Sequence, residues 1–182
     1  MGLHRLPRTR HGMGLPTLLA LVALVLPAAA GGGYAWTLPE NLSQTAGRST
    51  FPSLAQVSPG GDLWAVWTDA GSGSGDIMGR HRGAAGTWDG VLNLSDNVGR
   101  EAGPSLYVDR AGRGHLAWTR WGNPEGTEIA YRQWADGAWG PILVLDDVNV
   151  NPFPYNLLFA EDISGTVWLF ANLGSEVRYT RL

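Results

Sequence analysis

The chain repeats itself about every 51 residues, and this period constrains its fold more than any other feature. Trp36 opens the segment WTLPENLS, Trp88 opens the related WDGVLNLS, and Trp139 opens a third copy, WGPILVLD. In each copy a glycine turn leads into an apolar strand, and a segment such as Asp76–Arg80 follows. Three copies account for everything after residue 35, so the chain is read as an array of similar units.

Each copy predicts four short antiparallel strands. β-Branched and aromatic residues alternate with small or polar ones, and Gly or Pro interrupts the pattern about every ten residues. In the second copy Asp136-Gly137 marks a tight hairpin, because Asp-Gly readily supplies the positive φ angles that such a turn needs. Four strands in about 50 residues is the size of a propeller blade. We therefore expect an all-β fold, a partial β-propeller of about three four-stranded blades that form half of a six-bladed ring.

The tryptophans fit this architecture. A blade cannot bury both faces alone, so large rings on its strands are expected to pack between neighbouring blades. The rings placed on second strands are those of Trp64, Trp67, Trp118 and Trp168. Trp121 lies in a loop and has no counterpart in the first copy, which makes it a candidate for ligand binding.

Residues 1–30 are predicted to be a signal peptide. Arginines in the first ten positions precede an uncharged apolar run, residues 15–26, and three alanines at 28–30 suit a signal peptidase. The run is shorter than the roughly 20 residues that span a bilayer as a helix. We expect residues 31–182 to form the mature propeller, with repeats starting near 36, 88 and 139, secreted or otherwise extracytoplasmic and without a membrane span.

Composition excludes several kinds of partner and cofactor. Removing the signal leaves 10 of the 13 basic residues against all 16 acidic ones, which argues against nucleic acid as a ligand. There is no cysteine, and the histidines beyond the signal, His81 and His115, are not spaced as a metal cluster. No phosphate-binding loop or hydrolase signature is present. We expect neither a metal nor another cofactor.

The repeat resembles the bacterial sialidase-like β-propeller family, whose repeats carry an Asp-box. The resemblance rests on Pro-Ser-Leu, a strand ending in Trp-Thr-Asp or Trp-Thr-Arg, Glu-Ile-x-Tyr-Arg and Asp-Gly-x-Trp, and it covers the whole mature chain. The Asp-box is degenerate, because 136–139 keeps Asp-Gly-x-Trp whereas 86–88 has no aspartate. The resemblance implies an acidic sugar held by three arginines, with an aspartate acid/base and a tyrosine nucleophile assisted by a glutamate. The Arg-Ile-Pro motif of that family is absent.

Alternating strand directions gather the inter-blade segments and the loops between second and third strands on one rim. The ligand-binding candidates there are Arg48, Arg100, Arg120 and Trp121. A planar guanidinium suits bidentate capture of a carboxylate. The alternative is that Arg48 and Arg100 stiffen the rim by pairing with Glu101, Asp96 or a backbone carbonyl. Asp69 and Tyr155 are the catalytic candidates, although no motif supports either.

Three functions are therefore expected. The leading one is a secreted, non-catalytic module that binds a glycan or another acidic ligand at the rim. The others are a fragment or subunit of a sialidase-type exo-glycosidase, and a protein-interaction scaffold. The opening fourth strand, 36–43, and the closing third strand, 176–180, lack partners, which predicts either a homodimer with six blades or a longer protein truncated here.

Overall fold

The computed structural model describes residues 38–71, 75–95, 99–123, 126–148, 156–173 and 175–182. Pro39–Leu182 forms a compact unit, and all the regular structure described in it is β-structure. The expected signal peptide and the catalytic candidate Tyr155 lie outside the described residues. Within these ranges there is no helix with the length and apolar character needed to cross a membrane.

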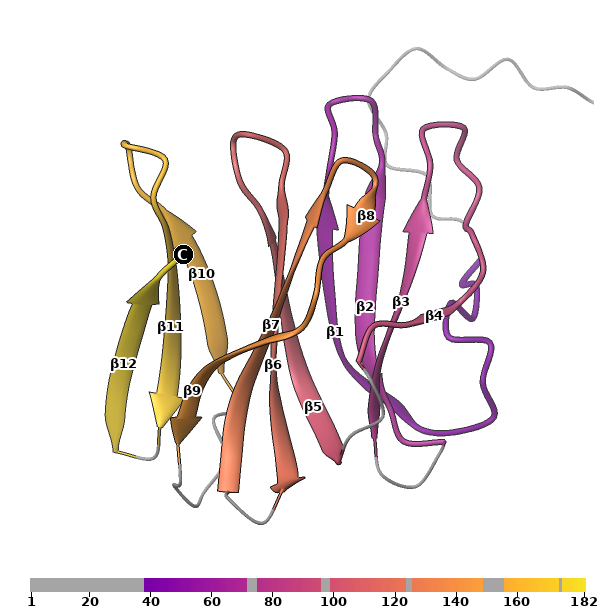
Figure 1. The fold of residues 1–182 in the computed structure, drawn as a ribbon. Coiled ribbons are helices and arrows are strands. Elements are labelled where there is room, and N and C mark those ends of the chain that lie inside the picture. Colours follow the sequence, from indigo (N-terminus) through magenta and orange to yellow (C-terminus); the bar gives the residue numbers. More distant parts are fainter. Residues whose placement is uncertain (1–37, 72–74, 96–98, 124–125, 149–155, 174) are drawn as a thin grey trace, which may run out of the picture. The chain divides into compact units, whose positions relative to one another are not determined.

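Three antiparallel sheets follow one another along the chain, and we call them blades 1, 2 and 3 (Figure 1). Blades 1 and 2 take their last strands from the start of the next repeat. Blade 1 contains β1 (Ser49–Gln56), β2 (Leu63–Asp69), β3 (Asp76–Arg82) and β4 (Leu92–Asn93). Blade 2 contains β5 (Arg100–Val108), β6 (Gly114–Asn123), β7 (Gly126–Ala135), β8 (Ala138–Trp139) and β9 (Leu143–Val148). Blade 3 contains β10 (Leu157–Glu161), β11 (Val167–Leu173) and β12 (Glu176–Arg181). This is the expected all-β partial propeller.

The fourth strand of a blade is interrupted where the sequence predicts a continuous one. In blade 2, β8 and β9 both pair with β7, and Gly140-Pro141 begins the gap between them. Proline has no N–H to donate to the ladder, so it interrupts the pairing. Blade 1 has the same form, since Trp88 makes an isolated bridge with Arg82 before β4 begins. The described part of the expected opening strand, residues 38–43, joins no sheet.

The third copy aligns differently from the sequence expectation. The register places Phe159, rather than Leu157, level with Leu54 of blade 1 and Leu106 of blade 2. β1 and β5 each contain a bulge, whereas β10 pairs with β11 residue for residue. In each bulge two residues of β1 or β5 lie opposite one residue of the neighbouring strand, so these copies do not align residue for residue with β10.

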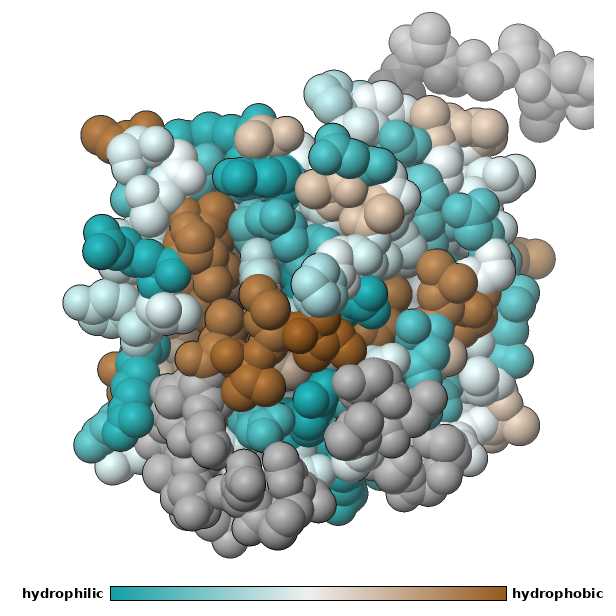
Figure 2. Space-filling view, in the orientation of Figure 1, coloured by the Kyte–Doolittle hydropathy of each residue, from teal (hydrophilic) through white to brown (hydrophobic). Residues whose placement is uncertain are grey.

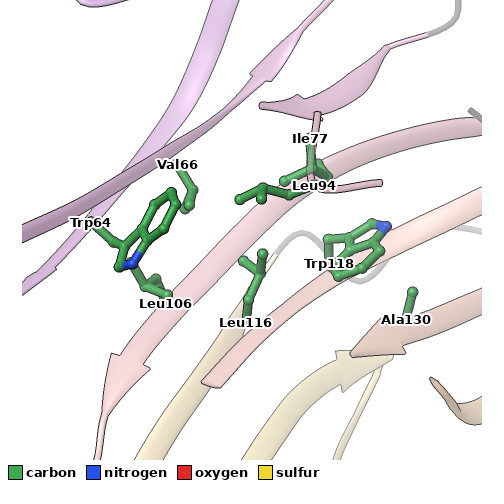
Figure 3. Packing of buried hydrophobic residues seen from close by; sticks show 8 residues of the cluster. All are labelled: Trp64, Val66, Ile77, Leu94, Leu106, Leu116, Trp118 and Ala130. Atoms are coloured by element: carbon green, nitrogen blue, oxygen red, sulfur yellow. The ribbon is translucent and has the colours of Figure 1, made fainter. Parts of the chain in front are cut away.

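Blades 1 and 2 pack through the first hydrophobic core (Figure 3). Its buried members are Trp64, Val66, Ile77 and Leu94 from blade 1 and Leu106, Leu116, Trp118 and Ala130 from blade 2. The Trp64 ring lies 5.1 Å from that of Trp134 and 5.3 Å from that of Trp139. Trp64 and Trp118 therefore fill the space between sheets, as expected. Burying one such large side chain contributes about 1.5–3 kcal/mol.

Blades 2 and 3 pack through a second core, made by Ala117, Ile129 and Tyr131 against Leu157, Leu169 and Ala171. Outside this core, apolar residues gather over β9, where Leu143 and Val144 are half exposed (Figure 2). A groove lined by Leu143, Leu145 and Val167 runs along this seam. At the outer edge of the interface between blades 2 and 3, apolar side chains are therefore left partly exposed to solvent.

An arginine on the third strand fastens each of the first two blades to the segment before it. Arg132 Nη1 donates a hydrogen bond of 2.8 Å to the carbonyl of Leu94, at the end of blade 1. Arg80 Nη1 donates one of 3.3 Å to the carbonyl of Leu42. Each Nε also donates to a carbonyl of its own blade, at 2.9 and 2.6 Å. We call this pair of contacts the arginine clasp. It places the Leu42 segment where a preceding blade would end.

Candidate functional site

A cavity of about 310 Å³ lies between blades 1 and 2, where β1 and β5 begin. We call it the rim cavity. Its lining residues are Arg48, Thr50, Phe51, Thr68, Ala70, Gly75, Arg100, Glu101, Ala102 and Trp121. The structure thus brings together three of the four predicted ligand-binding residues, although Trp121 lies in β6 rather than in the expected loop. They come from two blades, at the opposite end of β5 and β6 from the turn that joins these strands (Figure 1).

Backbone contacts hold the two walls of the rim cavity against each other. The Glu101 N–H donates to the Gly75 carbonyl at 3.1 Å, and the Gly103 N–H donates to Thr68 Oγ1 at 3.1 Å. Gly75 has a φ of 89°, and a Cβ there would lie 2.9 Å from the Glu101 carbonyl. Only glycine fits this close approach. The positions of the arginines on the two blades are therefore fixed by the fold.

Among the described residues, no anionic group pairs with the guanidinium of Arg48 or Arg100. Within the described residues the Arg48 side chain makes no hydrogen bond or ion pair, and Arg100 contacts only the Trp121 ring, with Cζ 5.1 Å from its centroid. This is a cation–π distance. Neither arginine pairs with Glu101, and Asp96 lies outside the described residues. Both can donate to an anion that enters the cavity.

Arg120 lies behind the rim cavity and does not line it. Its side chain is buried, with Nε 2.9 Å from Glu101 Oε1 and Nη1 3.7 Å from Glu128 Oε2. Burial raises the pKa of Glu101, although Ser95 and Arg120 act in the opposite direction. Arg120 therefore neutralises buried carboxylates and positions Glu101, whereas Arg48 and Arg100 face the cavity.

Asp69 is also engaged within the protein. It is buried, and it accepts hydrogen bonds from Thr45 Oγ1 at 2.6 Å, Ser49 Oγ at 3.2 Å and the Gly71 N–H at 2.8 Å. Burial alone would raise the pKa of Asp69, but these hydrogen bonds outweigh it and hold the pKa below its usual value. A general acid needs a raised pKa. Asp69 is built as a loop anchor, and the other catalytic candidate, Tyr155, lies outside the described residues.

Sequence reasoning missed Phe51, which lines the rim cavity with its side chain half exposed. Its φ is 53°, in the left-handed region that a bulky residue seldom adopts. Blade 2 has Gly103, with a φ of 65°, at the corresponding bulge 52 residues later. A strained residue held at a cavity is a pointer to function. The signal was present in the repeat, since a phenylalanine stands where the other copy has glycine.

A buried Asp109–His115–Tyr131 cluster looks catalytic but is explained by the repeat. His115 Nε2 lies 3.2 Å from Asp109 Oδ2, and Nδ1 lies 2.9 Å from the Tyr131 hydroxyl. At the same turn in blade 3, Trp168 Nε1 donates to Asp162 Oδ2 at 2.9 Å. The aspartate therefore caps a turn in both blades and orients the ring six residues later. Among the described residues no group of three acidic or histidine side chains forms a metal site.

No protein-family model matches the chain, and no curated protein sequence is significantly similar to it. Its fold is similar to the crystal structure of an endo-arabinase from Bacteroides thetaiotaomicron, at a TM-score of 0.51 and 14% identity. That match covers 80% of this chain and 60% of the endo-arabinase chain, so the chain spans less than two thirds of the enzyme. The similarity supports the propeller fold.

Two further structures are more distant. A β-xylosidase/α-arabinofuranosidase of family GH43 from a compost microbial metagenome has a TM-score of 0.45 and 14% identity, with 69% of this chain and 43% of that chain covered. A GH43_1 enzyme from Xanthomonas citri has a TM-score of 0.43 and 16% identity, with 69% and 40% covered.

Proposed function

We propose that the chain is an exported, non-catalytic propeller module that binds a carboxylate-bearing glycan in the rim cavity. The observation that carries this proposal is the placement of Arg48 and Arg100, which occupy equivalent repeat positions, line one cavity and have no anionic partner within the described residues. Two guanidinium groups converging on one cavity suit a carboxylate.

The cavity walls also suit a sugar. Phe51 and Trp121 supply aromatic surface, and Thr50 and Thr68 add hydroxyl groups among the lining residues. Apolar walls with a few placed polar groups are typical of small-ligand sites. In this proposal the arginines hold the carboxylate, the rings contact the sugar faces, and the buried Glu101–Arg120 pair supports the cavity wall.

A glycoside hydrolase, complete or as a fragment or subunit, is the second candidate. The fold similarity to an endo-arabinase favours it, as does the resemblance of the repeats to sialidase-like propellers. Most glycosidases use two carboxylates that flank the scissile bond. Glu101 is the single carboxylate among the described lining residues, and it is buried against Arg120. This arrangement favours binding over turnover. A protein-interaction scaffold is the third candidate function.

Binding to immobilised oligosaccharides tests the proposal. The panel pairs sialylated and uronic-acid-bearing glycans with their neutral counterparts, and the protein is assayed as wild type, Arg48→Ala, Arg100→Ala and Phe51→Ala. Losing one charge-assisted hydrogen bond costs about 1.5–3 kcal/mol, so each arginine variant should bind about ten- to a hundredfold more weakly. Phe51→Ala should weaken acidic and neutral sugars alike.

Arg110→Ala is the matched control, since Arg110 is exposed at the opposite end of β5 and donates to the Asp162 carbonyl. It removes the same charge and should leave glycan binding unchanged. Equal affinity for acidic and neutral glycans, or binding insensitive to both rim arginines, would refute the proposal. Release of reducing sugar from arabinan, or of fluorophore from a sialoside, would favour the hydrolase instead.

A further inference from the structure

The blades stack in one direction, and the same positions of the repeat face the next blade each time. Ile77 in blade 1 and Ile129 in blade 2 occupy corresponding positions on β3 and β7, and both are buried by the following blade, at 0% and 4% exposure. Val66 and Ala117 correspond in the same way on β2 and β6. We call this side of a blade its forward face.

The forward face of blade 3 is uncovered. Val177 corresponds to Ile77 and Ile129 but is 71% exposed. The pairing of β10, β11 and β12 puts further apolar side chains on the same side as Val177, namely Leu158, Trp168, Phe170 and Tyr179. The Tyr179 ring lies 5.5 Å from that of Trp168 and 5.9 Å from that of Phe170. An exposed apolar cluster of this kind marks an interaction surface.

On the opposite side of blade 1, Ala65 and Trp67 are buried, but Leu54 on the first strand is exposed. Leu106 of blade 2 lies at 8% exposure because blade 1 covers it, whereas Leu54, its counterpart in blade 1, is 61% exposed. Ile77 and Leu106 both belong to the core cluster between blades 1 and 2. Blade 3 thus exposes the face that blades 1 and 2 bury, and blade 1 exposes Leu54, the counterpart of a residue that such an interface buries.

We propose that the forward face of blade 3 binds blade 1 of a second copy of this chain, head to tail. The repeat supplies the complementary surface, since Val177 and Leu54 are the counterparts of Ile77 and Leu106, which both belong to the core between blades 1 and 2. The arginine clasp adds a second reason. It holds the Leu42 segment where a preceding blade would end, so the second copy brings this segment towards β12, whose residues are all exposed. A heterologous interface of this kind closes into a ring when its rotation allows.

Sedimentation equilibrium of the purified chain tests this proposal, with wild type, Val177→Glu and Leu54→Arg compared at equal concentration. We expect wild type at twice the monomer mass or a higher whole multiple, and each variant at the monomer mass. A mixture of Val177→Glu and Leu54→Arg should recover the wild-type mass, because one interface of the mixed pair is unaltered and the other sets glutamate against arginine.

Ile163→Glu is the control, because Ile163 is exposed in the β10–β11 turn, away from both faces. It should leave the mass unchanged, and circular dichroism should confirm that all variants keep their β-structure. A monomeric wild type overturns the proposal, as does a mixture that stays monomeric. Glycan binding by Val177→Glu is measured as well. A monomeric variant that still binds glycan shows that the interface and the rim cavity are tested independently.

Discussion

Replacing Arg120 by methionine removes the cation from the buried pair behind the rim cavity while keeping most of the side-chain volume. It leaves Glu101, which is fully buried, without its 2.9 Å partner. Removing one member of a buried ion pair costs about 3–5 kcal/mol. We expect a loss near the lower end, because Glu101 can take up a proton and so avoid an uncompensated charge.

Urea denaturation followed by tryptophan fluorescence measures this loss. Glu101 already has a raised pKa, and losing Arg120 should raise it further. A raised folded-state pKa gives stability that is present below about 4.5 and lost as the pH rises through the folded value. Arg120→Met should therefore be closer to wild type at pH 5 than at pH 8. Adding Glu101→Gln should recover most of the loss at pH 8, because no buried charge remains.

The control for this series is Arg110→Met, an exposed substitution expected to change the free energy of unfolding by at most about 0.5 kcal/mol. An equal loss in Arg120→Met at both pH values would refute the reasoning. So would a double variant no more stable than the single one, because the cost would then not arise from an unpaired Glu101.

Two further predictions concern the interfaces between blades. Burial lowers the pKa of His115, although Asp109 opposes this, so the unfolded chain binds the proton first. The free energy of unfolding should therefore fall as the pH drops from about 6.5 through the folded pKa. In urea denaturation, His115→Gln should lose less stability than wild type between pH 7.5 and 5.5, and an equal loss in both proteins would contradict this. Arg132→Met removes the donor to the Leu94 carbonyl and should lower the free energy of unfolding by about 2–3 kcal/mol. Arg178→Met is the control, because it loses only an exposed ion pair with a glutamate two residues away and should change the free energy of unfolding little. Equal losses in the two variants would argue against the arginine clasp.

The repeat predicted the all-β architecture because strand count, turn spacing and the placement of Trp64 and Trp118 are local properties of the sequence. Some residues of the rim cavity could be predicted from the repeat in the same way. Arg48 and Arg100 were found by their repeat position, whereas Phe51 was missed because phenylalanine does not itself indicate a positive φ, and only the glycine at the matching position, Gly103, points to one.

The role of the side chains at one repeat position could not be predicted, because the residue types at that position differ between blades. The cross-strand pair that is Ser49 and Asp69 in blade 1 is Glu101 and Arg120 in blade 2. An arginine in that place looked available to a ligand, but a carboxylate on the neighbouring strand pairs with it. Burial and pairing of this kind depend on contacts between strands, which the repeat period alone does not specify.

The clasp made by Arg80 and Arg132 has a practical consequence for dissecting the molecule. Each of these two blades is tied through its third strand to the polypeptide that precedes it, so a cut placed at a sheet boundary separates the arginine from its acceptor. Expression fragments should instead begin upstream of Leu42 or of Leu94, so that each unit includes the tail of its predecessor. Shortened clones designed by sheet limits would be expected to yield insoluble material.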